Sequence, residues 1–303
     1  MHALRTRAAI GRRQLRVTRM ALLAAALLCA PGLSFATSDT ASIQPGSQTA
    51  LPPDNVSHEI RLQAADPGQE HITLTARLSE DGGLIQQQID WTVRDADGSV
   101  IVASAEPFID IPARPGEYRI EARYGTMNIM RDLSLPEGQT LGVTFILNAG
   151  GLRVLSKIAG LGRVDVQQTA AVYAMNGLAP GRLIATSHIP GEVLRVPAGT
   201  YRIESRFAQG NAVALTEVTV KAGRMSAVEI GHHAGLARFS GPADAEWQIS
   251  DAKGEVQSEL SGSEADAVLK PGRYVVRTEI DGTARVRDFT VEDGQVVEVV
   301  ISP

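Results

Sequence analysis

The residues with the most obvious chemical potential are closely spaced carboxylates. Residues 95–99 read Asp-Ala-Asp-Gly-Ser, and Glu106 lies eleven positions after the first aspartate. Carboxylates at positions 1, 3 and 12 bind calcium in a helix–loop–helix site, but that loop also needs a glycine at position 6, where this chain has Val100. Residues 251–254, Asp-Ala-Lys-Gly, repeat the pattern without the second carboxylate. We therefore predict a hairpin turn in which glycine supplies a positive φ, and no metal site.

Histidine and serine are the other residues that could act as ligands or nucleophiles. Of the five histidines after residue 36, only His232 and His233 are close together in the sequence. Neighbouring strand residues point to opposite faces, so one metal ion cannot readily use both, and residues 231–235 are predicted to connect two domains. Beyond residue 36 there is no Gly-x-Ser-x-Gly elbow and no cysteine. We therefore predict no catalytic residue, no cofactor and no enzymatic activity.

Positive charge is concentrated in the middle of the chain. Residues 58–150 carry 7 basic and 14 acidic side chains, residues 151–235 carry 9 and 5, and residues 236–303 carry 7 and 13. Two roles stay open for the basic region: its arginines pack against the acidic flanking regions, or they bind an anionic partner such as an envelope protein or an acidic glycan. Short connectors between the regions favour the first role. The candidate binding residues for the second are Arg163, Arg182 and Arg195.

Composition limits the classes of protein to which the chain can belong. It has 303 residues, a formal net charge of −5 and 44% apolar residues. That is enough apolar material for packed cores, and the length allows two or three domains. The acidic balance argues against a nucleic-acid partner.

Residues 1–36 have the features of an export signal. Six arginines and no acidic residue precede the apolar residues 20–30, a run too short to span a bilayer as a helix. Small residues occupy the −3 and −1 positions before Thr37, where we expect cleavage. General secretory export is favoured, while twin-arginine export through Arg12 and Arg13 and a retained anchor stay open. The expected location is periplasmic or secreted, without a transmembrane segment in the mature chain.

A repeated motif indicates the domain organisation. Residues 115–121 read Pro-Gly-Glu-Tyr-Arg-Ile-Glu, and the pattern recurs at residues 197–204 and 271–277. In each copy a turn glycine and an alternating apolar strand follow. Alternation with a period of two, interrupted by Pro-Gly and Asp-Gly turns, is typical of short antiparallel strands. Each copy is therefore predicted to be one β-sandwich.

Aromatic residues are in register with these repeats. Trp91 and Trp247 each lie 27 residues before a repeat tyrosine, and the middle copy has residues 172–174, Val-Tyr-Ala, near that point. Such rings could stack on a glycan, but their regular register favours the core of a sandwich. We therefore predict that both tryptophans and the three repeat tyrosines are buried; the tyrosines are Tyr118, Tyr201 and Tyr274.

The predicted fold class is all-β, with three tandem antiparallel β-sandwich domains after a cleaved signal peptide. The copies differ, and the middle one is the most divergent. The predicted divisions are 1–36 for the signal peptide, 37–57 for a disordered leader, and 58–150, 151–235 and 236–303 for the three sandwiches.

The motif Pro-Gly-x-Tyr-x-Ile/Val, with the hairpin, glycine and terminal strand that follow it, resembles the immunoglobulin-like or prealbumin-like (carboxypeptidase-regulatory-like) modules of bacterial envelope proteins. The resemblance covers nearly all of residues 58–303. It implies the sandwich fold, and such modules serve as spacers, adhesins and accessory domains. We expect an exported, non-enzymatic binding or spacer protein of the bacterial envelope. The alternative is an envelope enzyme or accessory subunit with its site in loops at residues 163–191. The oligomeric state stays open.

The exported protein should begin at Thr37 or within a few residues of it, because the small residues before this position fit the requirement of signal peptidase. N-terminal sequencing of the exported chain tests this expectation. Recovery of the uncleaved chain in the membrane fraction would contradict it.

Overall fold

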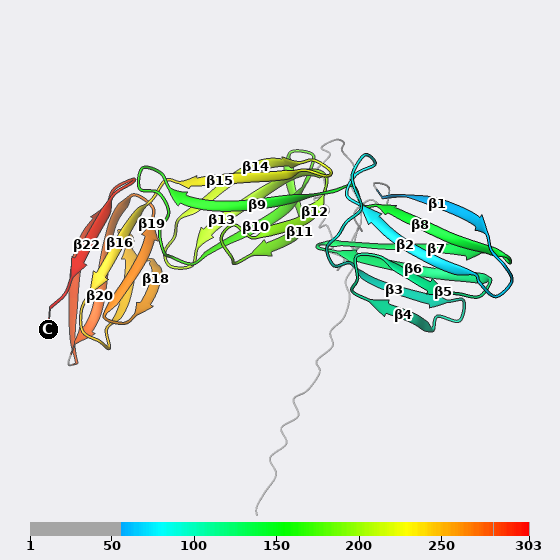
Figure 1. Cartoon of the computed structure of the whole chain (residues 1–303). Coiled ribbons are helices and arrows are strands. Elements are labelled where there is room, and N and C mark those ends of the chain that lie inside the picture. The colour runs from blue at the N-terminus through cyan, green and yellow to red at the C-terminus, as the bar shows by residue number, and fades with distance from the viewer. Residues whose placement is uncertain (1–55, 281, 303) are drawn as a thin grey trace, which may run out of the picture. The chain divides into compact units, whose positions relative to one another are not determined.

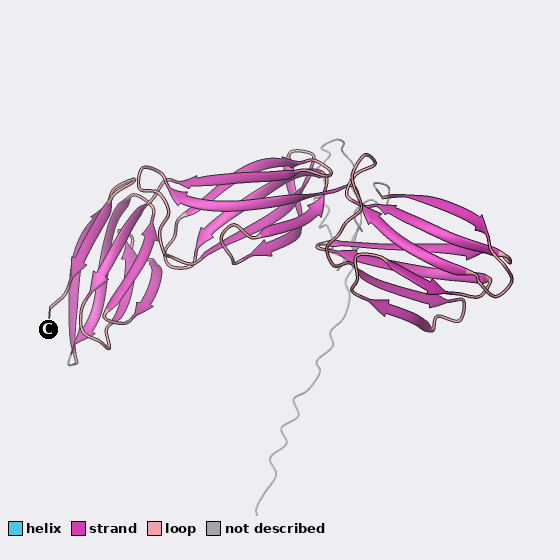
Figure 2. Cartoon of the chain, viewed as in Figure 1, coloured by secondary structure: helices cyan, strands magenta, loops and turns pink. Residues whose placement is uncertain are grey.

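The computed structural model describes residues 56–280 and 282–302, which form strands, turns and loops without a helix (Figures 1 and 2). The all-β prediction is confirmed. The predicted signal peptide and most of the leader lie outside the described residues. Within the described part of the chain, no helix could span a membrane.

The strands form three successive pairs of sheets, which we call modules 1, 2 and 3. Their strands lie within residues 57–146, 149–232 and 235–300. In each module, buried apolar side chains fill the space between two sheets, as in a β-sandwich. The prediction of three tandem β-sandwiches, which the resemblance also implied, is confirmed.

Module 1 has eight strands in two four-stranded sheets. The strands are β1 (Ser57–Ala64), β2 (His71–Arg77), β3 (Asp90–Asp95), β4 (Val100–Ser104), β5 (Ile109–Pro112), β6 (Gly116–Tyr124), β7 (Met127–Leu135) and β8 (Gln139–Ile146). The two sheets have the strand orders β1-β8-β2-β5 and β4-β3-β6-β7.

Modules 2 and 3 have seven strands each. Those of module 2 are β9 (Ala149–Ile158), β10 (Gln168–Asn176), β11 (Ala179–Ser187), β12 (Val193–Pro197), β13 (Gly199–Phe207), β14 (Val213–Val220) and β15 (Met225–His232), in sheets β12-β9-β15 and β11-β10-β13-β14. Those of module 3 are β16 (Gly235–Ser240), β17 (Glu246–Asp251), β18 (Val256–Ser261), β19 (Glu264–Leu269), β20 (Gly272–Ile280), β21 (Thr283–Val291) and β22 (Val296–Val300), in sheets β19-β16-β22 and β18-β17-β20-β21.

The three modules share one seven-stranded plan, to which module 1 adds β1. In every copy the first and last strands of the plan pair in parallel: β2 with β8, β9 with β15, and β16 with β22. All other strand pairs are antiparallel, as predicted. The parallel pair joins strands at opposite ends of the repeat, which local alternation cannot reveal.

The repeat tryptophans lie in the cores of modules 1 and 3. Trp91 and Trp247 are each 1% exposed. Each indole N–H donates to a carbonyl oxygen fifteen residues later, that of Glu106 at 3.0 Å or of Gly262 at 2.9 Å. The core prediction is confirmed, and rings enclosed in this way cannot form a glycan-stacking platform.

Module 2 has an alanine in the place of the tryptophan. In module 1 the tryptophan pairs with the residue four positions after the repeat tyrosine. In module 2 that residue is Ser205, and its partner on β10 is Ala170. The sequence pointed to residues 172–174 instead, because the chain between β10 and the repeat tyrosine is four residues longer in this module.

The three repeat tyrosines are buried, as predicted. Tyr118, Tyr201 and Tyr274 are 7%, 4% and 5% exposed. Each hydroxyl donates to the backbone carbonyl four residues earlier, at 2.5, 2.6 and 2.9 Å. This contact has the pattern of the tyrosine corner of immunoglobulin-like sandwiches, and it fixes the chain as it enters a central strand. Burial raises the pKa of Tyr201 to about 12, so its hydroxyl stays a donor at neutral pH.

Replacing Tyr118 by alanine should destabilise module 1 by about 3 kcal/mol, because it leaves a cavity in the core. Tyr118→Phe removes only the corner hydrogen bond and should cost about 1 kcal/mol. The chain has two tryptophans, so urea unfolding followed by Trp91 fluorescence in a Trp247→Phe background reports on module 1 alone. A loss below about 1 kcal/mol for Tyr118→Ala would show that this ring is not part of the core.

Candidate functional site

The predicted hairpin turn at residues 95–99 is confirmed. Asp95 Oδ1 accepts the backbone N–H groups two and four residues further on, at 3.1 and 2.9 Å. Asp251 Oδ1 makes the same two contacts at 2.9 and 3.0 Å. The glycines at these turns, Gly98 and Gly254, have φ values of 82° and 83°. Among the described residues, no group of three or more His, Cys, Asp or Glu side chains could hold a metal ion.

The adjacent histidines point in opposite directions, as predicted. His232, at the end of β15, is 1% exposed, and its ring packs edge-on against Phe207 with 4.7 Å between the centroids. The His233 side chain is 86% exposed, and its Nδ1 lies 3.0 Å from the carboxylate of Asp293. The two rings therefore cannot bind one ion together.

His232 belongs to a buried chain of polar groups where modules 1 and 3 have tryptophan. Ser156 Oγ lies 2.6 Å from Ser205 Oγ, which in turn lies 2.9 Å from His232 Nε2. A serine beside a histidine is the beginning of a nucleophile–base pair. However, all three side chains are buried, and Nδ1 of His232 has no hydrogen-bond partner within the described residues. No carboxylate orients the ring and no substrate could reach it, so the chain of contacts is structural.

The structure places the three candidate arginines in two separate regions of module 2. Arg195 lies on β12 opposite Gly151, near the start of β9, whereas Arg163 follows the end of β9 at Ile158. Seven residues of strand separate these points, a distance of about 23 Å. Arg182, on β11, lines a pocket that also includes residues 126–131 of module 1. The three arginines are exposed, but they do not converge on one site.

Arg195 contacts module 1 through an aromatic ring rather than a carboxylate. Its Nε donates to the Tyr124 hydroxyl at 2.8 Å, and its Cζ lies 5.0 Å from the centre of that ring. Among the residues that the structure describes, no ion pair joins an arginine of module 2 to a carboxylate of module 1 or 3. The expected pairing of these arginines with acidic neighbours is therefore not found there.

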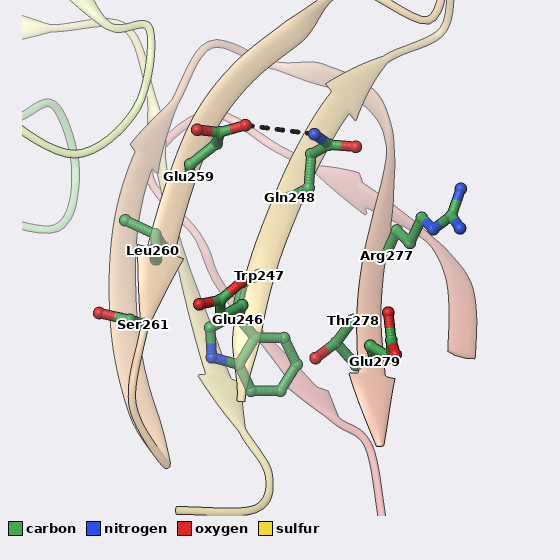
Figure 3. Close-up of a pocket in the computed structure, with 9 residues that line it drawn as sticks. All are labelled: Glu246, Trp247, Gln248, Glu259, Leu260, Ser261, Arg277, Thr278 and Glu279. Atoms are coloured by element: carbon green, nitrogen blue, oxygen red, sulfur yellow. Dashed lines mark hydrogen bonds between the residues drawn. The ribbon is translucent and has the colours of Figure 1, made fainter. Parts of the chain in front are cut away.

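A cleft of about 530 Å³ lies in the four-stranded sheet of module 3, where β17 and β20 separate (Figure 3). The ladder between these strands ends at Gln248 and Arg277. Beyond that point β17 stays paired with β18 as far as Glu246, and β20 stays paired with β21 as far as Ile280. In module 1 the matching strands stay paired for two further residues. The cleft is thus a local split between the central strands of one sheet.

Charge provides a physical reason for the split. If the ladder continued, Trp247 would face Thr278 and the next pair would be Glu246 and Glu279. Like charges on facing strand positions repel each other. At the corresponding positions module 1 has Asp90 and Arg123, which carry opposite charges and are paired in register.

Trp247 and Thr278 line the cleft from the side of the core. Thr278 is 2% exposed, and its hydroxyl has no hydrogen-bond partner within the described residues. Figure 3 shows this side chain turned towards the Trp247 indole across the gap. Module 1 has Ala122 at this position, and module 2 has Ser205, whose hydroxyl is hydrogen-bonded. A buried hydroxyl without a hydrogen-bond partner costs about 1–3 kcal/mol of folding stability. Module 3 therefore loses stability at the cleft relative to a sheet that stays closed there.

Sequence reasoning did not identify this cleft. The informative signal is the difference between Asp90 and Arg123 in module 1 and Glu246 and Glu279 in module 3. It becomes visible only when the strand register is known, because the two glutamates are 33 residues apart in the sequence.

Comparisons with known proteins find likenesses to one family and to solved structures of bacterial proteins. Residues 240–302, within module 3, match the family described as the Rhizobiales growth-associated tandem repeat domain. No curated protein matches the chain. The Bacillus anthracis TIE protein is 13% identical, with a TM-score of 0.24; the match covers 77% of this chain and 50% of that one.

Two pilins show similar levels of likeness. The minor pilin of Streptococcus agalactiae is 12% identical over 51% of this chain and 94% of its own, with a TM-score of 0.25. A streptococcal ancillary pilin is 9% identical over 76% and 98%, with a TM-score of 0.28. This chain spans half the length of the Bacillus anthracis protein. Such TM-scores are too low to establish a common fold, so the fold assignment rests on the sheets themselves.

The stability of module 2 should fall in acid because of His232. Burial lowers the pKa of this ring from 6.5 to about 4, so the folded module favours the neutral form. Stability that is fully present above pH 6.5 is therefore lost as the pH falls towards 4, because the unfolded chain takes up the proton first. The expected loss is about 2 kcal/mol after allowance for solvent screening.

Amide hydrogen exchange in β13, measured at pH 7 and pH 4.5, tests this expectation. In His232→Gln, the stability of module 2 should fall less between pH 7 and pH 4.5 than in the wild type. In His233→Gln, which changes the exposed neighbour, it should fall as much as in the wild type. Equal pH dependence in the wild type and His232→Gln would contradict the assignment.

Proposed function

We propose that the chain is an exported, non-enzymatic protein of the bacterial envelope or secreted fraction, in which three β-sandwich modules act as a spacer that carries a binding surface. The observation that supports this proposal best is the set of contacts between successive modules. These contacts are made by backbone groups and close-packed glycines, so they restrict movement between modules more than flexible linkers would.

The first junction joins the β6–β7 turn of module 1 to β12 of module 2. The backbone N–H and the hydroxyl of Thr126 both donate to the carbonyl oxygen of Arg195, at 3.0 and 3.1 Å. Gly125, in the same turn, has φ 62° and lies so close to Arg195 that a Cβ atom there would collide with its backbone and Cβ. The contact between Arg195 and Tyr124 completes this junction.

The second junction joins the β13–β14 connection of module 2 to β19 of module 3. Val268 N donates to the carbonyl oxygen of Gln209 at 2.9 Å, and Lys270 N donates to Asn211 Oδ1 at 2.8 Å. Asn211 Nδ2 also donates to the corner hydroxyl of Tyr274 at 3.2 Å. A separate cluster of buried apolar residues from both modules lies here: Ile158, Val166, Phe207, Ala212, Ala234, Leu236 and Val268.

Burial at the second junction distinguishes it from a surface contact. Ile158, Ala234 and Val268 are each 0% exposed, so the contact excludes water from apolar side chains at the junction of modules 2 and 3. Residues 163–191, where the enzymatic alternative expected a site, consist largely of β10 and β11. No observation in the described residues favours that alternative over the spacer role.

The partner of such a protein is proposed to be another component of the envelope, either a protein or an anionic glycan. The exposed Arg163 and Arg182 remain candidates for an anionic glycan, because no described ion pair neutralises either side chain. The periplasmic or secreted location depends on the export signal predicted in residues 1–36.

Replacing Gly125 by alanine should loosen the first junction, because the added methyl group cannot be accommodated against Arg195. Gly177 is a matched control: it also has φ 62°, in the β10–β11 turn, and no atom within 4 Å would meet its Cβ. Pulsed electron spin resonance between labels on β4 and β14 should give a broader distance distribution for Gly125→Ala and an unchanged one for Gly177→Ala. Equal distributions for both variants would contradict the spacer role.

A further inference from the structure

We propose that the cleft between β17 and β20 of module 3 binds a cationic nitrogen group, the ammonium of a lysine or the guanidinium of an arginine on a partner polypeptide. This inference goes beyond the spacer function, because it assigns a binding site and the chemistry of its ligand. Three features of the cleft support it: its charge, the split in the sheet that this charge explains, and, independently of both, an unpaired buried hydroxyl.

The charge of the cleft is negative. Three of its nine lining residues are glutamates, Glu246, Glu259 and Glu279, and one is an arginine, Arg277. All four side chains belong to exposed residues. Within the described residues none of the three carboxylates is in an ion pair. Glu259 accepts one hydrogen bond, from Gln248 Nε2 at 3.2 Å (Figure 3), which leaves acceptor capacity on every carboxylate.

The buried hydroxyl points to a ligand independently of charge. Thr278 lines the cleft, and its Oγ1 has no hydrogen-bond partner within the described residues. At the same position of the repeat, module 1 has Ala122, which has no hydroxyl, and module 2 has Ser205, whose hydroxyl is hydrogen-bonded. A hydroxyl oxygen can accept a hydrogen bond from a donor that enters the gap. A ligand with N–H groups would therefore satisfy an atom that the fold itself leaves unsatisfied.

An ammonium or guanidinium group fits this set of acceptors better than a metal ion does. Lysine offers three hydrogen-bond donors and arginine offers five. Both also carry a positive charge that would balance the negative charges of Glu246 and Glu279 on either side of the gap. In module 1, Arg123 occupies the position of Glu279 opposite Asp90, so the common plan already places a basic side chain here. Module 3 replaces this internal cation by a carboxylate and opens the sheet. The described residues, by contrast, contain no cluster of ligands suited to a metal.

Isothermal titration of the mature chain with acetyl-trilysine amide and acetyl-triarginine amide tests the site. The double variant Glu246→Gln/Glu279→Gln should weaken binding at least tenfold, because it removes both carboxylates that flank the gap. Glu298→Gln is the matched control, since Glu298 is exposed on β22 in the other sheet of the module. It should change affinity by less than twofold. An effect on binding no larger than that of the control would overturn the proposal.

The variant Thr278→Val distinguishes an effect on peptide binding from an effect on folding stability, because the two are expected to change in opposite directions. Valine has nearly the shape of threonine and removes the unsatisfied hydroxyl, so the variant should unfold at a higher temperature and bind the peptides more weakly. Lower stability would show that the hydroxyl has a structural partner, and unchanged binding would show that it does not meet the ligand. Either result would overturn the proposed role of the cleft and leave the junction experiment on Gly125 unaffected.

Two sources of the cationic group can be distinguished by sedimentation velocity. Association of the mature chain with itself, lost in Glu246→Gln/Glu279→Gln, would identify a basic side chain of a second copy as the ligand. A chain that stays monomeric while it binds the peptides would identify a different polypeptide. Failure to bind either peptide, in a chain that also stays monomeric at high concentration, would overturn the proposal.

Discussion

The parallel pairing of the first and last strands is the constraint on which the rest of the structure depends. Two parallel neighbours start at the same end of a module, so the seven-stranded plan begins at one end and finishes at the other. Successive copies can therefore follow one another through short connectors. The turns and strand ends that meet there become the junctions, and the glycines and carbonyl groups at those places must be compatible with a neighbouring module.

The copies differ at two facing positions of the core, that of the tryptophan and that of the residue opposite it on the neighbouring central strand. Trp91 and Trp247 fill the first position with an indole, whereas module 2 has Ala170 and builds a hydrogen-bonded chain from Ser156 through Ser205 to His232. Such a network holds its members in one arrangement, but the unpaired Nδ1 of His232 makes it costly. In module 3 the indole is present and Thr278 beside it carries the unpaired group. Each departure from apolar packing thus makes one module chemically distinct.

The sequence could predict what is local or repeated, and little else. The all-β class, the buried Tyr118 and Trp91 and the aspartate–glycine turn follow from patterns within a few residues, which strand periodicity and turn chemistry determine directly. The parallel pairing, the place of Ala170 and the cleft at Thr278 could not be predicted, because each depends on a strand register between residues far apart in the chain. For the same reason the arginines looked like one basic surface, although the length of β9 separates Arg163 from Arg195.

The direction of the terminal strands also has a mechanical consequence. If the two ends of module 2 or module 3 are pulled apart, the parallel first and last strands slide along each other, and all hydrogen bonds between them resist together in shear rather than opening one after another. The parallel ladder has eight paired positions in module 2 and five in module 3. Under tension, module 3 should therefore yield before module 2.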